Sequence, residues 1–260
     1  MEQAAQYSSR TWVGKQHLHL VETDSTNNRA LEYIHQPDAH GLVISAETQT
    51  SGRGQYGRTW QDGTGQAVLL SVLLYPSQII QRASIMTAYG AIAVAQTLEH
   101  FVNEKPLIKW PNDVLVNGKK VCGILLEGGT TPHQVPYVVI GIGLNVRQTQ
   151  AYFDAAGLPQ GGSLQTVTGK ELKTSDVRDC LIDQLDRLYG ELQARGPCVL
   201  EEKWVEYTQL SGRQVQVVLH RGDILVGILH QQQFGQIVVR HPTGMWHGAP
   251  EEIRNIFLIR

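Results

Sequence analysis

The pair Asn117-Gly118 constrains this 260-residue chain more than any other feature, because it separates two apolar runs, Val114–Val116 and Val121–Leu126. Asn-Gly readily adopts the positive φ angles of a two-residue turn, so the pattern predicts a tight β-hairpin. Its polar side chains are Lys109, Asn112, Asp113, Lys119 and Lys120. Such a concentration of charge is compatible with a solvated surface or with a binding site, and the hairpin alone does not separate the two.

A second polar segment follows a predicted buried strand over residues 42–48. Between residues 52 and 58 it contains three glycines and the two arginines Arg53 and Arg58. Turn geometry does not require arginine, and like charges repel each other. Glycine permits close backbone approach, and guanidinium groups offer forked donors to phosphate or carboxylate. The composition therefore favours an anion-binding loop over an ordinary mobile loop, although the spacing is not that of a Walker A motif.

Two glycines interrupt a third predicted strand, Tyr137–Val146. Side chains alternate along a strand, so Gly141, Gly143 and Asn145 share one face. Glycine weakens a strand interior, and two on one face indicate that something packs flat against the backbone there. Another element of the chain and a planar ligand both satisfy this pattern.

The remaining segments predict a mixed architecture with two parts. Residues 23–26 supply helix-capping side chains, which can also hold a polar ligand, and buried elements follow at 66–75 (strand) and 84–101 (helix). We expect a loop over 149–169 and a helix from residue 175. Short strands at 213–219, 224–230, 236–240 and 253–259 predict a small all-β barrel.

The composition excludes several classes of protein. The net charge of −2 gives no global attraction to nucleic acid or anionic membranes. No apolar run approaches the ~18 residues of a membrane span. The three cysteines lack the spacing of a zinc site or a disulfide framework, and the first residues do not resemble a secretory signal. We therefore expect a cytoplasmic protein that does not enter a membrane.

Taken together, five motifs resemble those of the biotin protein ligases in order and spacing. They are Asp24-Ser-Thr-Asn27, Gln49-x-x-Gly-Arg-Gly-x-x-Gly-Arg-x-Trp60, Lys109-Trp-Pro-Asn-Asp113, Lys120-x-x-Gly-Ile-Leu-Leu-Glu127 and Gly141-Ile-Gly-Leu-Asn145. The resemblance implies an α+β fold, in which a mixed β-sheet packed with helices, similar to class II aminoacyl-tRNA synthetases, precedes an SH3-like β-barrel. We place the catalytic domain at residues 1–208 and the barrel at residues 209–260.

The resemblance also implies a reaction. Biotin would be activated by ATP and Mg²⁺ to biotinyl-5′-AMP, and biotin would then pass to a lysine of a biotin carboxyl carrier domain of acetyl-CoA carboxylase or a related carboxylase. A lipoate or octanoate ligase or transferase of the related fold is the nearest alternative, and a catalytically inactive biotin or adenylate sensor is another. A homodimer through a sheet edge is feasible.

By the same resemblance, each site residue has an expected role. The biotin-binding residues would be Ser25, Thr26, Asn27, Gln49, Gly52, Arg53, Lys120, Gly123, Gly141 and Gly143. The ATP-binding residues would be Arg53, Arg58, Trp60, Asn112, Asp113, Lys120 and Asn145. Lys120, Arg53 and Asp113 would be catalytic, and Asp113 and Asn145 would hold Mg²⁺.

The chain departs from the family pattern at two places. Only about 20 residues precede the first motif, so we expect no N-terminal winged-helix domain, no DNA partner and no repressor role. Gln55 stands where family members often have arginine after Gly-Arg-Gly.

Gln55 generates a prediction about the intermediate. A neutral amide at this position removes one cation that could retain an anionic adenylate, so we expect the reaction type to persist and more biotinyl-AMP to escape. The measurement is the amount of biotinyl-AMP released into solution, compared with an enzyme that has arginine there. Equal or smaller release would contradict the expectation.

Overall fold

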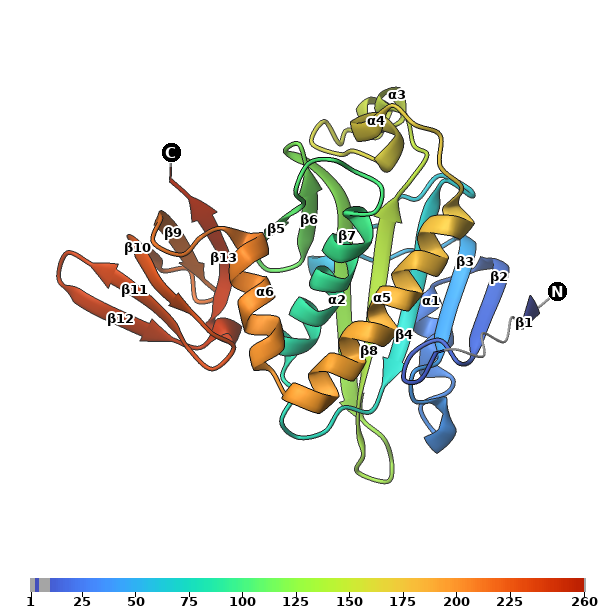
Figure 1. The fold of residues 1–260 in the computed structure, drawn as a ribbon, viewed down its shortest axis with the longest axis horizontal. Helices are drawn as coiled ribbons and strands as arrows, with labels where there is room; N and C mark the ends of the chain where they lie inside the picture. The colour runs from blue at the N-terminus through green and yellow to red at the C-terminus, as the bar shows by residue number, and fades with distance from the viewer. Residues whose placement is uncertain (1–2, 5–9, 260) are drawn as a thin grey trace.

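The computed structural model describes residues 3–4 and 10–259, and in these residues eight strands form one mixed sheet in the order β1-β2-β3-β4-β8-β7-β6-β5 (Figure 1). The strands are β1 (Gln3–Ala4), β2 (His17–Thr23), β3 (Val43–Gln49), β4 (Ala67–Leu74), β5 (Leu107–Lys109), β6 (Asp113–Val116), β7 (Lys119–Thr130) and β8 (Pro136–Asn145). Only β2 and β3 pair in parallel, and the other pairs described are antiparallel. The predicted α+β fold is confirmed.

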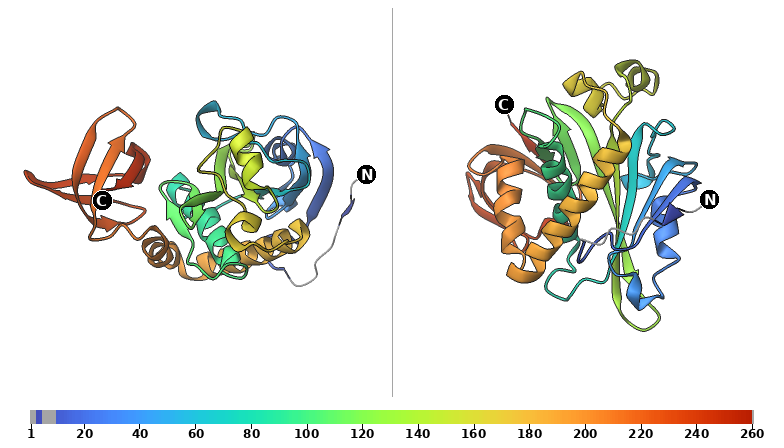
Figure 2. Two further views of the ribbon diagram at one scale, coloured as in Figure 1. Left: turned by 90° about the horizontal axis from the view of Figure 1, so that it is seen from above. Right: turned by 45° about the vertical axis from the view of Figure 1, so that its right-hand side comes forward.

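Helices cover both faces of this sheet. The helices are α1 (Thr26–Leu31), α2 (Ala83–Leu98), α3 (Gln150–Ala155), α4 (Leu164–Thr168), α5 (Thr174–Arg195) and α6 (Cys198–Thr208). Helices α2, α5 and α6 lie on one face (Figures 1 and 2). On the other face, α1 packs through Ala30 against Ile44, Leu73 and Val139. Every residue of β4 is buried, because both faces of this central strand are covered.

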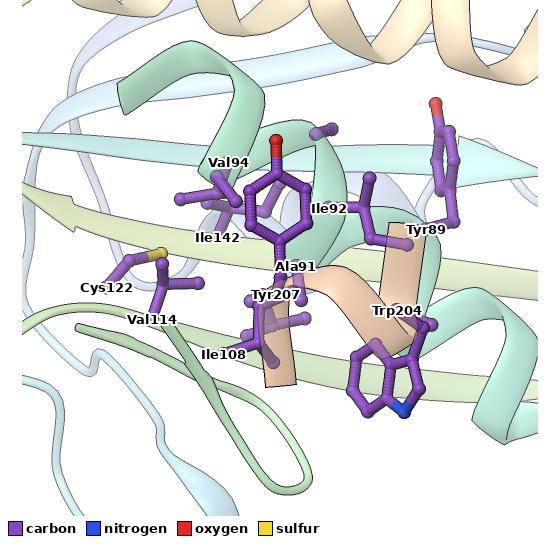
Figure 3. Packing of buried hydrophobic residues seen from close by; sticks show 14 of the residues in the cluster. Tyr89, Ala91, Ile92, Val94, Ile108, Val114, Cys122, Ile142, Trp204 and Tyr207 are labelled. Carbon is purple, nitrogen blue, oxygen red and sulfur yellow. The ribbon is translucent and has the colours of Figure 1, made fainter. Parts of the chain in front are cut away.

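The predicted hairpin joins β6 to β7. Asn117 and Gly118 have φ angles of 52° and 74°, as a two-residue turn of the primed type requires. Val114 and Cys122 are fully buried, and Figure 3 shows them beside Ile142 of β8 and Val94 of α2. The apolar side of the hairpin therefore belongs to the core, which leaves its polar residues at the opposite side.

A second sheet follows α6, and its described strands run in the order β12-β11-β10-β9-β13. They are β9 (Gln214–Leu219), β10 (Ile224–Gln232), β11 (Ile237–His241), β12 (Gly244–Gly248) and β13 (Ile253–Leu258). All pairs in it are antiparallel, and it lies beside the large sheet (Figure 2), which is consistent with the expected SH3-like part. Trp204 of α6 joins the two parts, because its ring lies 5.7 Å from Trp110 and 6.2 Å from Phe234 between ring centroids.

One expectation about secondary structure is wrong, and one strand was not predicted. The segment 149–169 is not a loop, since it contains α3 and α4, and β12 was not expected. Short helices have too few turns for an apolar periodicity to be detected in the sequence. Side chains cap both of these helices: Thr149 accepts a hydrogen bond from Tyr152 N, and Ser163 accepts one from Thr166 N. No helix in the described part of the chain has the length and apolar character of a membrane span.

The turn geometry predicts the stability of one variant. In Gly118→Ala a side chain would have open space, so the cost is the left-handed backbone itself. We expect a loss of about 1 kcal/mol in the free energy of unfolding, measured by urea denaturation. Gly235→Ala is the matched control, because Gly235 is exposed, has open space and does not adopt the left-handed region. Equal effects for the two variants would contradict the prediction.

Candidate functional site

The parallel pairing of β2 and β3 brings two of the motifs together. Thr23 pairs with Gln49 in register, and the pairing continues into the following loops, where Thr50 N donates to Thr23 O and Ser51 N to Asp24 O, both at 2.9 Å. The strands end at the same edge of the sheet. The start of α1 and the start of the glycine-arginine loop therefore lie side by side.

Gln49 caps α1 from this neighbouring strand. Its Oε1 accepts hydrogen bonds from the backbone N of Thr26 at 2.7 Å and from Thr26 Oγ1 at 3.1 Å. Ser25 occupies the N-cap position but makes no capping hydrogen bond with its side chain. Ser25, Thr26 and Asn27 are each only 3% exposed. The expected capping by hydroxyls is therefore replaced by a glutamine cap, and the small polar side chains are buried beside it.

The loop over residues 52–60 forms a narrow ribbon. Trp60 N donates to Gly52 O at 3.0 Å, Gly54 N donates to Arg58 O at 2.7 Å, and Arg53 bridges Thr59. The 3₁₀ turn η2 (Gln55–Gly57) closes its tip, and Arg58 is exposed. The ribbon places the Arg53 and Trp60 side chains against the sheet.

The double glycine in β8 receives side chains from other elements. A Cβ atom on Gly143 would lie 2.4 Å from the Trp60 indole, and one on Gly141 would lie 2.4 Å from Asn27 Oδ1. A Cβ atom on Gly123 of β7 would lie 3.1 Å from the same indole and 3.5 Å from Lys120 Nζ. The feature that packs flat on this face is therefore the indole and an amide, with an ammonium group beside them.

Each of the two predicted site cations next to this face has a carboxylate partner. Arg53 Nη2 lies 3.1 and 2.9 Å from the two oxygens of Glu127, and its Nη1 donates to Asn28 Oδ1 at 2.7 Å. Lys120 Nζ lies 2.6 Å from Asp113 Oδ1. The three predicted catalytic residues therefore take part in two ion pairs, Arg53 with Glu127 and Lys120 with Asp113.

A chain of hydrogen bonds connects Glu127 to the N-terminus of α1. Asn27 Nδ2 donates to Glu127 Oε2 at 2.6 Å, and Ser71 Oγ of β4 lies 2.5 Å from Asn27 Oδ1 and 2.7 Å from Thr26 Oγ1. Asn27 Oδ1 can only accept, so Ser71 donates to it. Ser71, Asn28 and a role for Glu127 were not predicted from the sequence. The signal for Ser71 is a lone hydroxyl, fully buried, in the apolar strand 67–74.

Two predicted ATP-binding amides hold the backbone together. Asn112 Nδ2 donates to Ile124 O at 2.7 Å, and Ile124 N donates to Asn112 O. Asn145 Nδ2 donates to Gly162 O, and its Oδ1 accepts from Gln148 Nε2, both at 3.0 Å. As arranged, both amides therefore join neighbouring segments of the chain.

The segment between α3 and α4 fixes the backbone of Lys120. Lys120 N donates to Gln160 O at 2.8 Å, and Gly162 N donates to Lys120 O at 2.9 Å. Lys120 also forms a parallel bridge with Gly161. The unexpected helical segment therefore contributes to the site, because it sets the position of this lysine.

The residues fit Mg²⁺ only in part. The described residues contain no group of three His, Cys, Asp or Glu side chains that could hold a metal ion. Mg²⁺ at phosphate-transfer sites commonly needs just one or two carboxylates, with substrate phosphates and water as its other ligands. Asp113, whose side chain is 22% exposed, can supply such a carboxylate. Asn145 fits less well, since its amide oxygen already accepts a hydrogen bond.

Two groups near the site have shifted pKa values. A hydrogen bond from the Asn28 amide lowers the pKa of Asp24, so this carboxylate remains charged at neutral pH. Burial raises the pKa of Cys122, although nearby Lys120 opposes the shift. Cys122 is therefore a neutral thiol of the core and not a nucleophile.

The contact at Gly143 predicts a coupled pair of variants. In Gly143→Ala the new methyl group would overlap the Trp60 indole, so we expect the free energy of unfolding to fall by about 1 kcal/mol or more. Combining it with Trp60→Ala removes the overlapping ring, and most of this loss should disappear. Denaturant unfolding of the two single variants and the double variant gives the coupling energy. Additive effects would show that the ring does not restrict this position.

The chain is similar to several known proteins. Residues 20–145 match the Biotin/lipoate A/B protein ligase family. The bifunctional ligase/repressor BirA of Bacillus subtilis is 31% identical over 207 residues, which cover 79% of this chain and 64% of BirA. The biotin–[acetyl-CoA-carboxylase] ligase of Paracoccus denitrificans is 29% identical over 234 residues, covering 86% of this chain and 94% of that protein.

Solved structures support the same fold. The biotin protein ligase of Aquifex aeolicus in complex with biotin and ATP superposes with a TM-score of 0.74 at 22% identity, covering 94% of this chain and 99% of that one. The chain spans about two thirds of BirA, 64% of its length. Residues 20–145, which match the Biotin/lipoate A/B protein ligase family, contain all five motifs.

Proposed function

We propose that this protein is an ATP-dependent biotin protein ligase that modifies a biotin carboxyl carrier domain. A carboxylate oxygen of biotin attacks the α-phosphorus of ATP, the bond to the β-phosphate breaks, and pyrophosphate leaves. A lysine amine of the carrier then attacks the carbonyl carbon of biotinyl-5′-AMP, an amide forms, and AMP leaves with the bonding electrons. The amine loses a proton in this second step.

One observation carries the proposal: two ion-paired cations lie beside a flat, glycine-backed face. Arg53 and Lys120 come from different segments, and Lys120 Nζ and the Trp60 ring both lie against Gly123. The first step requires two anions to approach each other, and fixed positive charge in a site sheltered from water offsets their repulsion. The relative named as a biotin–[acetyl-CoA-carboxylase] ligase supports the same chemistry.

The biotin end of the site would be built around α1. Ser25, Thr26 and Gln49 offer hydroxyl and amide groups to the ureido ring, with Asn27 beside them and backbone from Gly52 and Gly123 within reach. Gly141 and Gly143 let the Asn27 amide and the Trp60 indole lie flat against β8, where both would line the biotin pocket. Arg53 and Lys120 would meet the biotin carboxylate and the α-phosphate.

The nucleotide end would use the ribbon and the hairpin. Arg58, which is exposed at the ribbon, would contact the outer phosphates, and Trp60 would wall the pocket. Asn112 and Asp113 would hold ATP from the hairpin, and Asn145 of β8 would also contact it. Mg²⁺ would offset charge on the phosphates. Asp113 is its proposed ligand, and ligation by Asn145 would require its amide oxygen to leave Gln148.

Incubation with labelled biotin, ATP, Mg²⁺ and a carrier domain tests the function directly. We expect label on one lysine of the carrier, together with AMP and pyrophosphate. Lipoate offered in place of biotin should not support ATP-pyrophosphate exchange. Exchange with lipoate alone would assign the protein to the lipoate-specific branch, and absence of AMP formation with biotin would indicate an inactive sensor.

The role of Lys120 is tested by a pair of neighbouring lysines. Lys120→Ala removes a charged donor aimed at the reacting carboxylate and phosphate, so we expect adenylation to slow by about 100-fold or more. Lys119→Ala is the control, because the Lys119 ammonium donates to Pro159 O, away from Asp113. Pyrophosphate exchange measures both rates. An unchanged rate in Lys120→Ala would refute its assignment.

A further inference from the structure

The ion pair between Arg53 and Glu127 has the geometry of a contact that can exchange. A single nitrogen of Arg53, Nη2, meets both oxygens of Glu127 at 3.1 and 2.9 Å. This is not the fork-on-fork arrangement of two parallel hydrogen bonds that makes arginine-carboxylate pairs strong. The two side chains are 37% and 32% exposed, and pairs with such exposure contribute little to stability.

The two partners differ in how firmly they are held. Glu127 lies on β7 and accepts a second, shorter hydrogen bond of 2.6 Å from Asn27 Nδ2. Asn27 in turn contacts the buried Ser71 hydroxyl and lies against Gly141. Arg53 lies on the ribbon, and its other side-chain hydrogen bond within the described part of the chain is to Asn28 Oδ1. If the pair separates, Glu127 therefore stays in place and Arg53 is the side chain that moves.

We propose that Glu127 is a positioning residue. It holds the Arg53 guanidinium beside the site in the free protein and releases it to the carboxylate of biotin when biotin binds. This inference rests on the proposed function. The Glu127 carboxylate and the biotin carboxylate compete for one guanidinium group. Part of the free energy gained when Arg53 binds biotin is therefore offset by the cost of breaking its ion pair with Glu127. The alternative is that Glu127 remains bonded and orients Arg53 permanently toward the ligand. The two arrangements predict opposite effects of removing the charge of Glu127.

Glu127→Gln separates them, because the amide keeps an oxygen for the Asn27 donor while losing the charge. The affinities of biotin and of its neutral carboxamide are measured by calorimetry at low ionic strength, and their ratio gives the preference for the carboxylate. With competition, the preference should rise by about two- to fivefold in the variant, the range for one partly exposed ion pair. The gain should shrink as salt is added. A purely structural role would change both affinities together.

Two further variants complete the experiment. Glu127→Ala removes the charge together with the hydrogen bond to Asn27, and it should shift the preference in the same direction even if the Gln variant does not fold. Glu206→Gln neutralises a carboxylate that pairs with Lys105 on the surface, and it should leave the preference unchanged. An unchanged or smaller preference in the folded Glu127 variants overturns the proposal. Failure of the unaltered protein to bind biotin would instead overturn the proposed function, and with it this inference.

Discussion

The site depends on the close approach of two side chains to the backbone of β8. The Trp60 indole and the Asn27 amide lie where Gly143 and Gly141 would otherwise carry Cβ atoms. This contact fixes how near the ribbon and α1 can come to the sheet, and Arg53 of the ribbon donates to Asn28 of α1. A larger residue at either glycine would push one of these elements outward, so the position of the Arg53 guanidinium depends on the absence of two side chains.

Charge balance is the second organising feature. The two cations at the centre of the site, Arg53 and Lys120, face Glu127 and Asp113 at hydrogen-bonding distance. Each cation is thus paired with a carboxylate, so neither leaves an uncompensated positive charge in the site. The overall net charge of −2 gives no indication of these local ion pairs. Any anion that enters meets cations whose positions are already set by internal carboxylates.

Much of the fold was predictable because it rests on local rules. The Asn117-Gly118 turn follows from backbone φ preferences, and the flat contact at Gly141 and Gly143 follows from strand periodicity. The contacts among Asn27, Ser71 and Glu127 were not predictable in this way, because they join residues 44 and 100 positions apart. The register of β4, β7 and β8 sets these contacts, and no local pattern reports it. The boundary at residues 208 and 209 stays a prediction.

The parallel register of β2 and β3 also determines where the chain can tolerate insertions and deletions without loss of the site. Thr23 and Gln49 end their strands together, whereas the connection over residues 32–42 returns the chain to the opposite end of the sheet. Additions or losses at the exposed residues 35–38 of this return segment would leave the register intact, whereas Ala39 and Leu42 of the same segment belong to the core. One residue inserted in β3 would reverse the facing of its side chains and misalign the glutamine cap. Length variation among related proteins should therefore accumulate in the return segment, while new ligand preferences would arise by paired replacements around residues 24–28 and 49–52.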